Sequence, residues 1–126
     1  MFKKIIFTSF IVSIFFLSCK KEPDIQFCEG LTTQGKGKDC GTVFTTGDLT
    51  AVIKRAKGFG NNSITVNIYQ KRDNLKQKME SLNLEVKNTD TQTNANLSFY
   101  NTGVYQVEAK AGDEIFAESI ITIQDE

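Results

Sequence analysis

Alternation of apolar and polar residues along most of the chain is the feature of this sequence that most restricts its fold. Apolar side chains occupy every second position in one short segment after another, at residues 49–53, 64–68, 82–86, 97–99 and 105–109. A period of two places alternate side chains on opposite faces of a β-strand, so each segment is expected to be a strand with one buried face. Short strands separated by turn residues are typical of β-sandwiches and β-barrels. We therefore predict an all-β, Greek-key β-sandwich of about seven strands, with a small β-barrel as the alternative.

Three segments carry more specific structural predictions. Residues 49–69 are expected to form a β-hairpin, because two alternating runs flank a turn rich in glycine and asparagine. Between residues 73 and 82 the leucine and methionine residues fit a helical spacing, but strands are predicted on both sides. We expect an irregular or edge strand there, with a short helix as the alternative. The polar segment 88–96 is predicted to be a loop.

The N-terminal segment combines positive charge with an apolar run and a cysteine. Lys3 and Lys4 precede an apolar stretch that continues to Leu17, and Ser18 stands directly before Cys19. Such a segment is typical of an export signal. Its ~13 apolar residues are fewer than the ~20 that a transmembrane helix needs.

The residues Phe16, Leu17, Ser18 and Cys19 resemble the signal of bacterial lipoproteins. The resemblance implies cleavage after Ser18 and acylation of Cys19, with palmitate as an expected acyl chain. Two or more acyl chains hold a protein stably on a membrane. The alternative is an ordinary secretory signal with an incidental cysteine.

This resemblance also sets the expected organisation of the chain. Residues 1–18 would be the signal peptide, residues 19–27 a polar tether carrying the lipid, and residues 28–126 the folded domain. Lys20 follows the cysteine, which resembles the pattern of lipoproteins sorted to the outer membrane. The expected location is therefore the bacterial outer membrane, with the domain either in the periplasm or at the cell surface.

The chain contains three cysteines, and lipidation of Cys19 leaves Cys28 and Cys40. An even pair in an exported protein favours a disulfide, because the compartment is oxidising. Free thiols are the alternative, and two cysteines without histidine form a poor metal site. We expect the disulfide to close a flexible, glycine-rich loop over residues 28–41.

Residues 101–107 read Asn-Thr-Gly-Val-Tyr-Gln-Val. They resemble the D-x-G-x-Y-x-C sequence that opens strand F in the immunoglobulin superfamily, with Asn101 in the aspartate position and Val107 in the cysteine position. The resemblance implies an immunoglobulin-like sandwich in which Gly103 permits the turn and Tyr105 enters the core. The tyrosine hydroxyl would then bond to the backbone across the corner. The alternative is an unrelated strand with a chance match.

Two groups of residues are candidates for partner binding. The first is basic, is expected near one end of the predicted hairpin and its exit, and comprises Lys54, Arg55, Lys57, Lys71, Arg72, Lys76 and Lys78. Such a group attracts acidic proteins, anionic glycans or lipopolysaccharide. The second points away from the predicted core and comprises Tyr69, Tyr100, Phe116 and Ile120. If they cluster, these side chains would form an interaction patch. For the basic group the alternative is an ordinary solvated strand end, and for the second group it is that the side chains are scattered.

Composition and motifs argue against several classes of function. The formal net charge is +0 and falls slightly below zero without the signal, so no basic face for nucleic acid is expected. The chain has no histidine, the side chain best suited to proton transfer near neutral pH and a common metal ligand. No calcium loop or catalytic motif occurs. We predict no enzyme, metal or cofactor, but a binding or structural module that contacts an envelope or extracellular protein or glycan. An accessory or inhibitor subunit in the periplasm is the alternative, and a carboxylate-based enzyme is less favoured.

Overall fold

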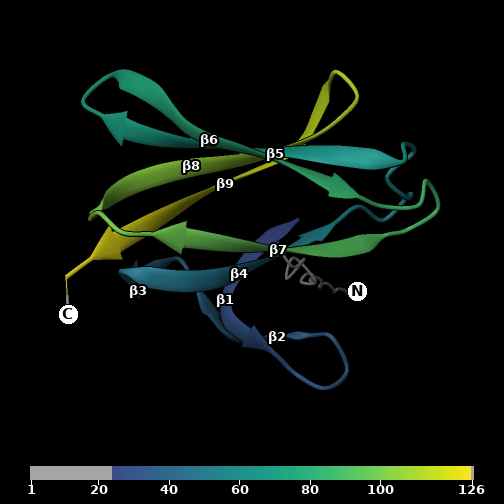
Figure 1. Ribbon diagram of the computed structural model, residues 1–126, viewed down its shortest axis with the longest axis horizontal. Helices are drawn as coiled ribbons and strands as arrows, with labels where there is room; N and C mark the ends of the chain where they lie inside the picture. Colours follow the sequence, from purple (N-terminus) through teal and green to yellow (C-terminus); the bar gives the residue numbers. More distant parts are fainter. Residues whose placement is uncertain (1–23, 126) are drawn as a thin grey trace, which may run out of the picture.

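The computed structural model describes residues 24–125, most of which lie in β-strands (Figure 1). The nine strands of this part of the chain are β1 (Ile25–Leu31), β2 (Gly37–Gly41), β3 (Val43–Thr45), β4 (Gly47–Lys54), β5 (Ser63–Arg72), β6 (Leu75–Glu85), β7 (Gln92–Phe99), β8 (Gly103–Ala111) and β9 (Glu114–Gln124). They form a four-stranded sheet in the order β2-β1-β4-β7 and a five-stranded sheet in the order β3-β9-β8-β5-β6. The lipoprotein-like signal and Cys19 lie outside the described residues.

The two sheets form a sandwich with one apolar core between them. The core takes alternate side chains from both sheets, and its members include Phe27, Ile53, Ile64, Val66, Leu97, Val107, Ile121 and Ile123. The two sheets are separate and do not close on themselves, so the barrel alternative is wrong and the predicted β-sandwich is confirmed.

The strand order corresponds to that of an immunoglobulin-like Greek key. In such sandwiches strands A, B, E and D share one sheet, and strands C, F and G share the other. Here β1, β4 and β7 occupy the positions of A, B and E, while β5, β8 and β9 occupy those of C, F and G. Strand β3 pairs in parallel with β9. Within residues 24–125 no strand takes the place of D beside β7, which therefore forms an edge of its sheet.

The predicted hairpin over residues 49–69 is wrong. Strand β4 pairs with β1 and β7, whereas β5 pairs with β6 and β8 in the other sheet. Residues 55–62 therefore cross between the sheets, and the side chain of Phe59 in this crossing is 0% exposed. Alternation correctly indicated that each strand has one buried face. It did not reveal whether consecutive strands pair in one sheet or face each other across the core.

Two further segments differ in how well they were predicted. Residues 75–85 form the edge strand β6, which confirms the preferred edge strand over the helix, and the register with β5 shifts between Ile68 and Tyr69. The predicted loop 88–96 is partly wrong, because β7 begins at Gln92. Gln92 and Asn94 are polar because they are exposed on the outer face, and Thr93 points inward but is only half-buried at the edge of the sheet. Their composition therefore resembled that of a loop.

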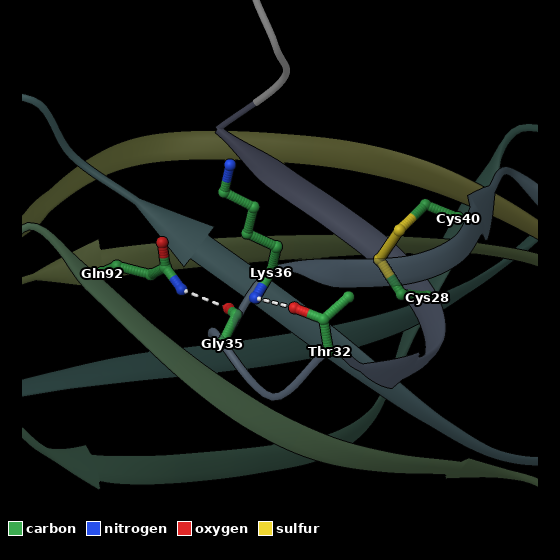
Figure 2. The surroundings of a disulfide bond; sticks show 6 residues. All are labelled: Cys28, Thr32, Gly35, Lys36, Cys40 and Gln92. Carbon is green, nitrogen blue, oxygen red and sulfur yellow. Dashed lines mark hydrogen bonds between the residues drawn. A yellow bond between two sulfur atoms is a disulfide. The ribbon is translucent and has the colours of Figure 1, made fainter.

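The N-terminal part of the domain is more ordered than expected. Strand β1 begins inside the predicted tether, and Ile25 is 1% exposed. Residues 28–41 form most of the β1–β2 hairpin rather than a flexible loop. The predicted disulfide is present: Cys28 and Cys40 are opposite each other on the two strands, with an S–S distance of 2.02 Å. Figure 2 shows the hairpin loop close to β7, where the side-chain amide of Gln92 donates to the carbonyl of Gly35 at 3.0 Å.

Candidate interaction surface

The predicted basic group is divided between the two ends of the sandwich. Strand β5 has 10 residues, and at about 3.3 Å per residue it spans roughly 30 Å. Lys54, Arg55 and Lys57 lie where β4 ends, whereas Lys71 and Arg72 lie where β5 ends (Figure 1). The single cluster predicted from the sequence is therefore wrong. Lys54 directly precedes the connection to β5, whereas Lys71 lies almost a full strand beyond that connection, so a β4–β5 hairpin would have separated the two residues equally.

The end that contains residues 55–62 and the β8–β9 turn is called the crossing end, and Arg55 is built into it. Its guanidinium donates to the carbonyl of Phe59 at 3.0 Å and pairs with Glu114 at 2.9 Å. The guanidinium carbon also lies 4.9 Å from the ring centre of Phe116. The Arg55 side chain is only 11% exposed. It therefore stabilises the fold and offers little surface to a partner.

Of the other predicted residues at the crossing end, some pack against the domain and others are exposed to solvent. Phe116 is half-buried, and its ring centre lies 5.9 Å from that of Phe59. Lys54 is half-buried at the end of β4, and Lys57 is exposed in the crossing segment. Phe116 was predicted to point away from the core, but it packs against the core.

The opposite end of the sandwich, called the tip end, carries the β5–β6 hairpin turn. We define residues 71–79 as the basic tip; its basic side chains are those of Lys71, Arg72, Lys76 and Lys78, and its carboxylate is Asp73. Every residue of the tip is exposed, with Leu75 at 74% and Met79 at 47%. In the described chain outside the tip, acidic residues outnumber basic ones. The positive charge is therefore concentrated at one end of the domain.

The turn of the basic tip follows from its sequence. Arg72 pairs with Leu75, so only Asp73 and Asn74 connect the two strands. Tight hairpin turns of this length need residues that tolerate positive φ, which asparagine and aspartate do. Asp73 has a φ of 54°. Because the β5–β6 ladder continues to this turn, the tip is a structured element and not a loose loop.

A hydrogen-bonded network on the outer face of the five-stranded sheet supports the tip. One carboxylate oxygen of Glu108 accepts from the amide of Asn67 and from the hydroxyl of Tyr69, both at 3.0 Å. Ser81 on β6 donates to Asn67 at 2.7 Å. Burial raises the pKa of Tyr69, and the hydrogen bond and negative charge of Glu108 raise it further. The ammonium of Lys76 lies 4.7 Å from the centre of the Tyr69 ring.

The predicted tyrosine corner lies directly beneath the tip. The hydroxyl of Tyr105 donates to the carbonyl of Asn101 at 2.7 Å, and its ring is 4% exposed. Gly103 has a φ of 150°, and a Cβ there would come within 2.9 Å of the side-chain nitrogen of Gln70. The buried Gln70 in turn accepts from Arg72 at 3.3 Å. The geometry expected for Gly103 and Tyr105 is therefore present, and it connects the corner to the first residues of the tip.

A hollow of about 400 Å³ opens beside the basic tip, between the edge strands of the two sheets. Its lining residues are Ile68, Met79, Glu80, Ser98, Phe99, Tyr100, Asn101 and Tyr105. Tyr100 is 77% exposed at its rim, so of the predicted apolar group Tyr100 and Tyr69 belong to the tip end. Ile120, 47% exposed, lies on the outer face of the five-stranded sheet opposite Gln106.

Sequence reasoning missed the hollow and the buried polar network. Asn67 and Glu108 occupy outward positions of their strands, where polar residues are expected to be exposed, yet they are 4% and 5% exposed. Their burial depends on the bonds between neighbouring strands and leaves no signal in the local pattern. The hollow depends on which edges the sheets leave open, which the sequence also did not indicate.

The described residues contain no group of histidine, cysteine or carboxylate side chains arranged to hold a metal ion. Residues 24–125 also include no helix of the length and hydropathy that crossing a membrane requires. No protein-family model matches the chain, and the search of curated proteins returned no match.

Proposed function

We propose that the chain is an exported, lipid-anchored binding module of the bacterial envelope, and that it binds an acidic partner through the basic tip. The observation that carries this proposal is the uneven distribution of charge and exposed apolar area. Four basic side chains of the tip, together with Leu75 and Met79, extend beyond the core of an otherwise acidic domain. Such a surface attracts negatively charged partners and offers apolar contacts once they arrive.

The remaining features support a module without catalysis. Glu108 is held by Asn67 and Tyr69 and is 5% exposed, so this carboxylate braces the sheet and is not presented to a substrate. The resemblance of residues 16–19 to a lipoprotein signal supports export and anchoring. The Cys28–Cys40 disulfide is compatible with an oxidising compartment.

Binding is tested with a synthetic peptide of ten glutamates as the probe. The variant K76E/K78E is expected to weaken binding strongly, and binding of the unchanged protein is expected to fall as salt rises, because exposed charges are screened over about 8–10 Å near physiological ionic strength. The matched control K57E/K87E carries the same charge change on exposed residues outside the tip. Equal binding by both variants would overturn the assignment of the site.

Anchoring and location are tested separately on intact cells. A Cys19→Ser variant is expected to lose metabolic lipid labelling and membrane retention, and labelling that persists would refute the anchor. Digestion of the domain by added protease places it outside the cell. Protection until the outer membrane is permeabilised places it in the periplasm and favours an accessory subunit of an envelope complex.

A further inference from the structure

The described chain has four strand edges without a neighbouring strand, and three of them are protected. Strand β3 has only 3 residues, and β2 has 5 and includes Lys38 and Asp39. Strand β6 carries two lysines and two glutamates and has the register shift opposite Ile68 and Tyr69. Short length, charge and bulges are the means by which natural sheets prevent unwanted pairing at an edge.

The fourth edge, that of β7, has none of these protections. Its 8 residues pair with β4 without a register shift, and they include no charged residue and no proline. The uncharged stretch extends well beyond the strand, over residues 91–107. Within residues 24–125 no strand covers the second edge of β7. Alternate backbone N–H and C=O groups along this edge are therefore available for pairing.

The hollow of about 400 Å³ lies against the end of this same edge. Ser98 and Phe99 of β7 line one side, and Met79 and Glu80 of β6 line the other. An immunoglobulin sandwich places strand D beside strand E, which is the position next to β7. A strand added there would direct every second side chain inward. At the end of β7, the inward side chains would meet Phe99, which is 3% exposed, and Met79, which is 47% exposed.

We propose that the edge of β7 accepts an extended segment of a partner protein as an additional strand. This inference rests on the proposed function as a binding module and names how the partner binds. The segment pairs through its backbone with β7, places apolar side chains into the hollow, and carries acidic residues where it passes the basic tip. The positive charge of the tip favours an acidic segment, whereas the negative charge of Glu80 in the hollow disfavours acidic residues at that point.

The first test uses two synthetic peptides, each with three glutamates followed by seven residues of alternating valine and threonine. In the second peptide every amide of the valine-threonine part is N-methylated, which keeps the side chains and charges but removes the donors. Hydrogen exchange of each β7 amide is followed by NMR. We expect the first peptide to slow exchange at every second amide of β7 by more than about tenfold and the second peptide to leave it unchanged, because each lost backbone bond weakens the complex.

The tip variant separates failure of this inference from failure of the proposed function. In one outcome, K76E/K78E weakens binding of the first peptide, but that peptide protects no β7 amide in the unchanged protein. The peptide then binds at the tip alone, so strand addition is wrong and the proposed function stands. If β7 is protected equally in K76E/K78E and in wild type, strand addition stands without the charge preference of the tip. If neither peptide binds, the inference is overturned.

A second copy of this chain is the other candidate occupant of the β7 edge, and the experiment must distinguish it from a partner protein. If the free protein sediments as a dimer in which alternate β7 amides are already protected, a second copy occupies the edge, and the partner-protein proposal is overturned. A monomer with rapidly exchanging alternate β7 amides is the expected result for the free protein.

The variant M79D adds a second carboxylate to the hollow and is expected to weaken binding of the first peptide about tenfold or more. The matched variant L75D, at the exposed turn, is expected to retain more of that binding.

Discussion

The two ends of the sandwich use similar residues for different purposes. At the crossing end, Arg55 is 11% exposed and is fixed by a carbonyl, a carboxylate and an aromatic ring. At the tip end, Lys71, Lys76 and Lys78 are exposed, and within the described chain no carboxylate lies at salt-bridge distance from them. A cation therefore stabilises the fold where the chain packs around it and remains available to a partner where a strand pair extends beyond the core.

This difference follows from how each connection meets the core. The crossing segment must pass over the open end of the sandwich, and Phe59 closes that end with a side chain that is 0% exposed. The β5–β6 turn continues an existing ladder outward, so its side chains meet solvent on both faces. Stability is therefore expected to depend on the crossing end, and binding on the tip end.

The largest expected effect is on the crossing end. Phe59→Ala removes a fully buried ring that packs against Phe116, and it should lower the free energy of unfolding by about 3–5 kcal/mol. Leu75→Ala removes a side chain that is 74% exposed and should change it by less than about 0.5 kcal/mol. Urea denaturation measures both values. Similar losses in the two variants would contradict the division between the ends.

Arg55→Ala is expected to have the next largest effect, about 1.5–3 kcal/mol, because the bond from a charged group to the carbonyl of Phe59 is lost at a nearly buried site. Glu114 is 64% exposed, so Glu114→Ala should cost less than about 1 kcal/mol. Lys76→Ala is the control at the tip end and should be nearly neutral. If Glu114→Ala costs as much as Arg55→Ala, the ion pair and not the carbonyl bond fixes this side chain.

Features encoded by local sequence could be predicted without the structure. The period of two indicated the strands, the pair of cysteines indicated the disulfide, and the spacing of Gly103 and Tyr105 indicated the corner that the Tyr105–Asn101 bond closes. The alternation and the corner each depend on residues that are near one another in the chain. The disulfide could be predicted because only two cysteines remain once Cys19 is assigned to the lipid. The edge-strand position of β6 was also predicted correctly, because its weak apolar pattern could not support a helix alone.

Features that depend on distant pairing could not be predicted in the same way. The alternation in β4 and β5 is the same whether the two strands pair in one sheet or face each other across the core, so it does not determine which strands pair. The edge strand β7 was partly mistaken for a loop because Asn94 and Asn96 are exposed on its outer face and the inward Thr93 is only half-buried, so these positions carry no strongly apolar residue. The hollow results from that open edge, so it too was absent from the sequence-based prediction.

The tyrosine corner is expected to contribute modestly to the stability of the tip end. Tyr105→Phe keeps the buried ring but removes the 2.7 Å bond to the carbonyl of Asn101, and it should lower the free energy of unfolding by about 1 kcal/mol. Tyr100→Phe is the matched control, because Tyr100 is 77% exposed. The basic tip should remain paired in both variants, as residue-resolved hydrogen exchange can show. Unpairing of the tip in Tyr105→Phe alone would mean that the corner supports the tip more directly than its contacts indicate.

The smallest effect is expected in alkaline solution, and it too belongs to the tip end. Burial raises the pKa of Tyr105, although the positive charge of Arg72 lowers it, and burial together with Glu108 raises the pKa of Tyr69. A group whose folded-state pKa is raised contributes stability below its unfolded pKa, here 10.0, and loses that contribution as the pH rises through the folded value. Stability should therefore decline above pH 10.0, and more gently in the variant Y69F/Y105F. Urea titrations at several alkaline pH values measure the slopes. Identical slopes would show that these two hydroxyls do not ionise on unfolding in that range, and would place the alkaline sensitivity elsewhere in the chain.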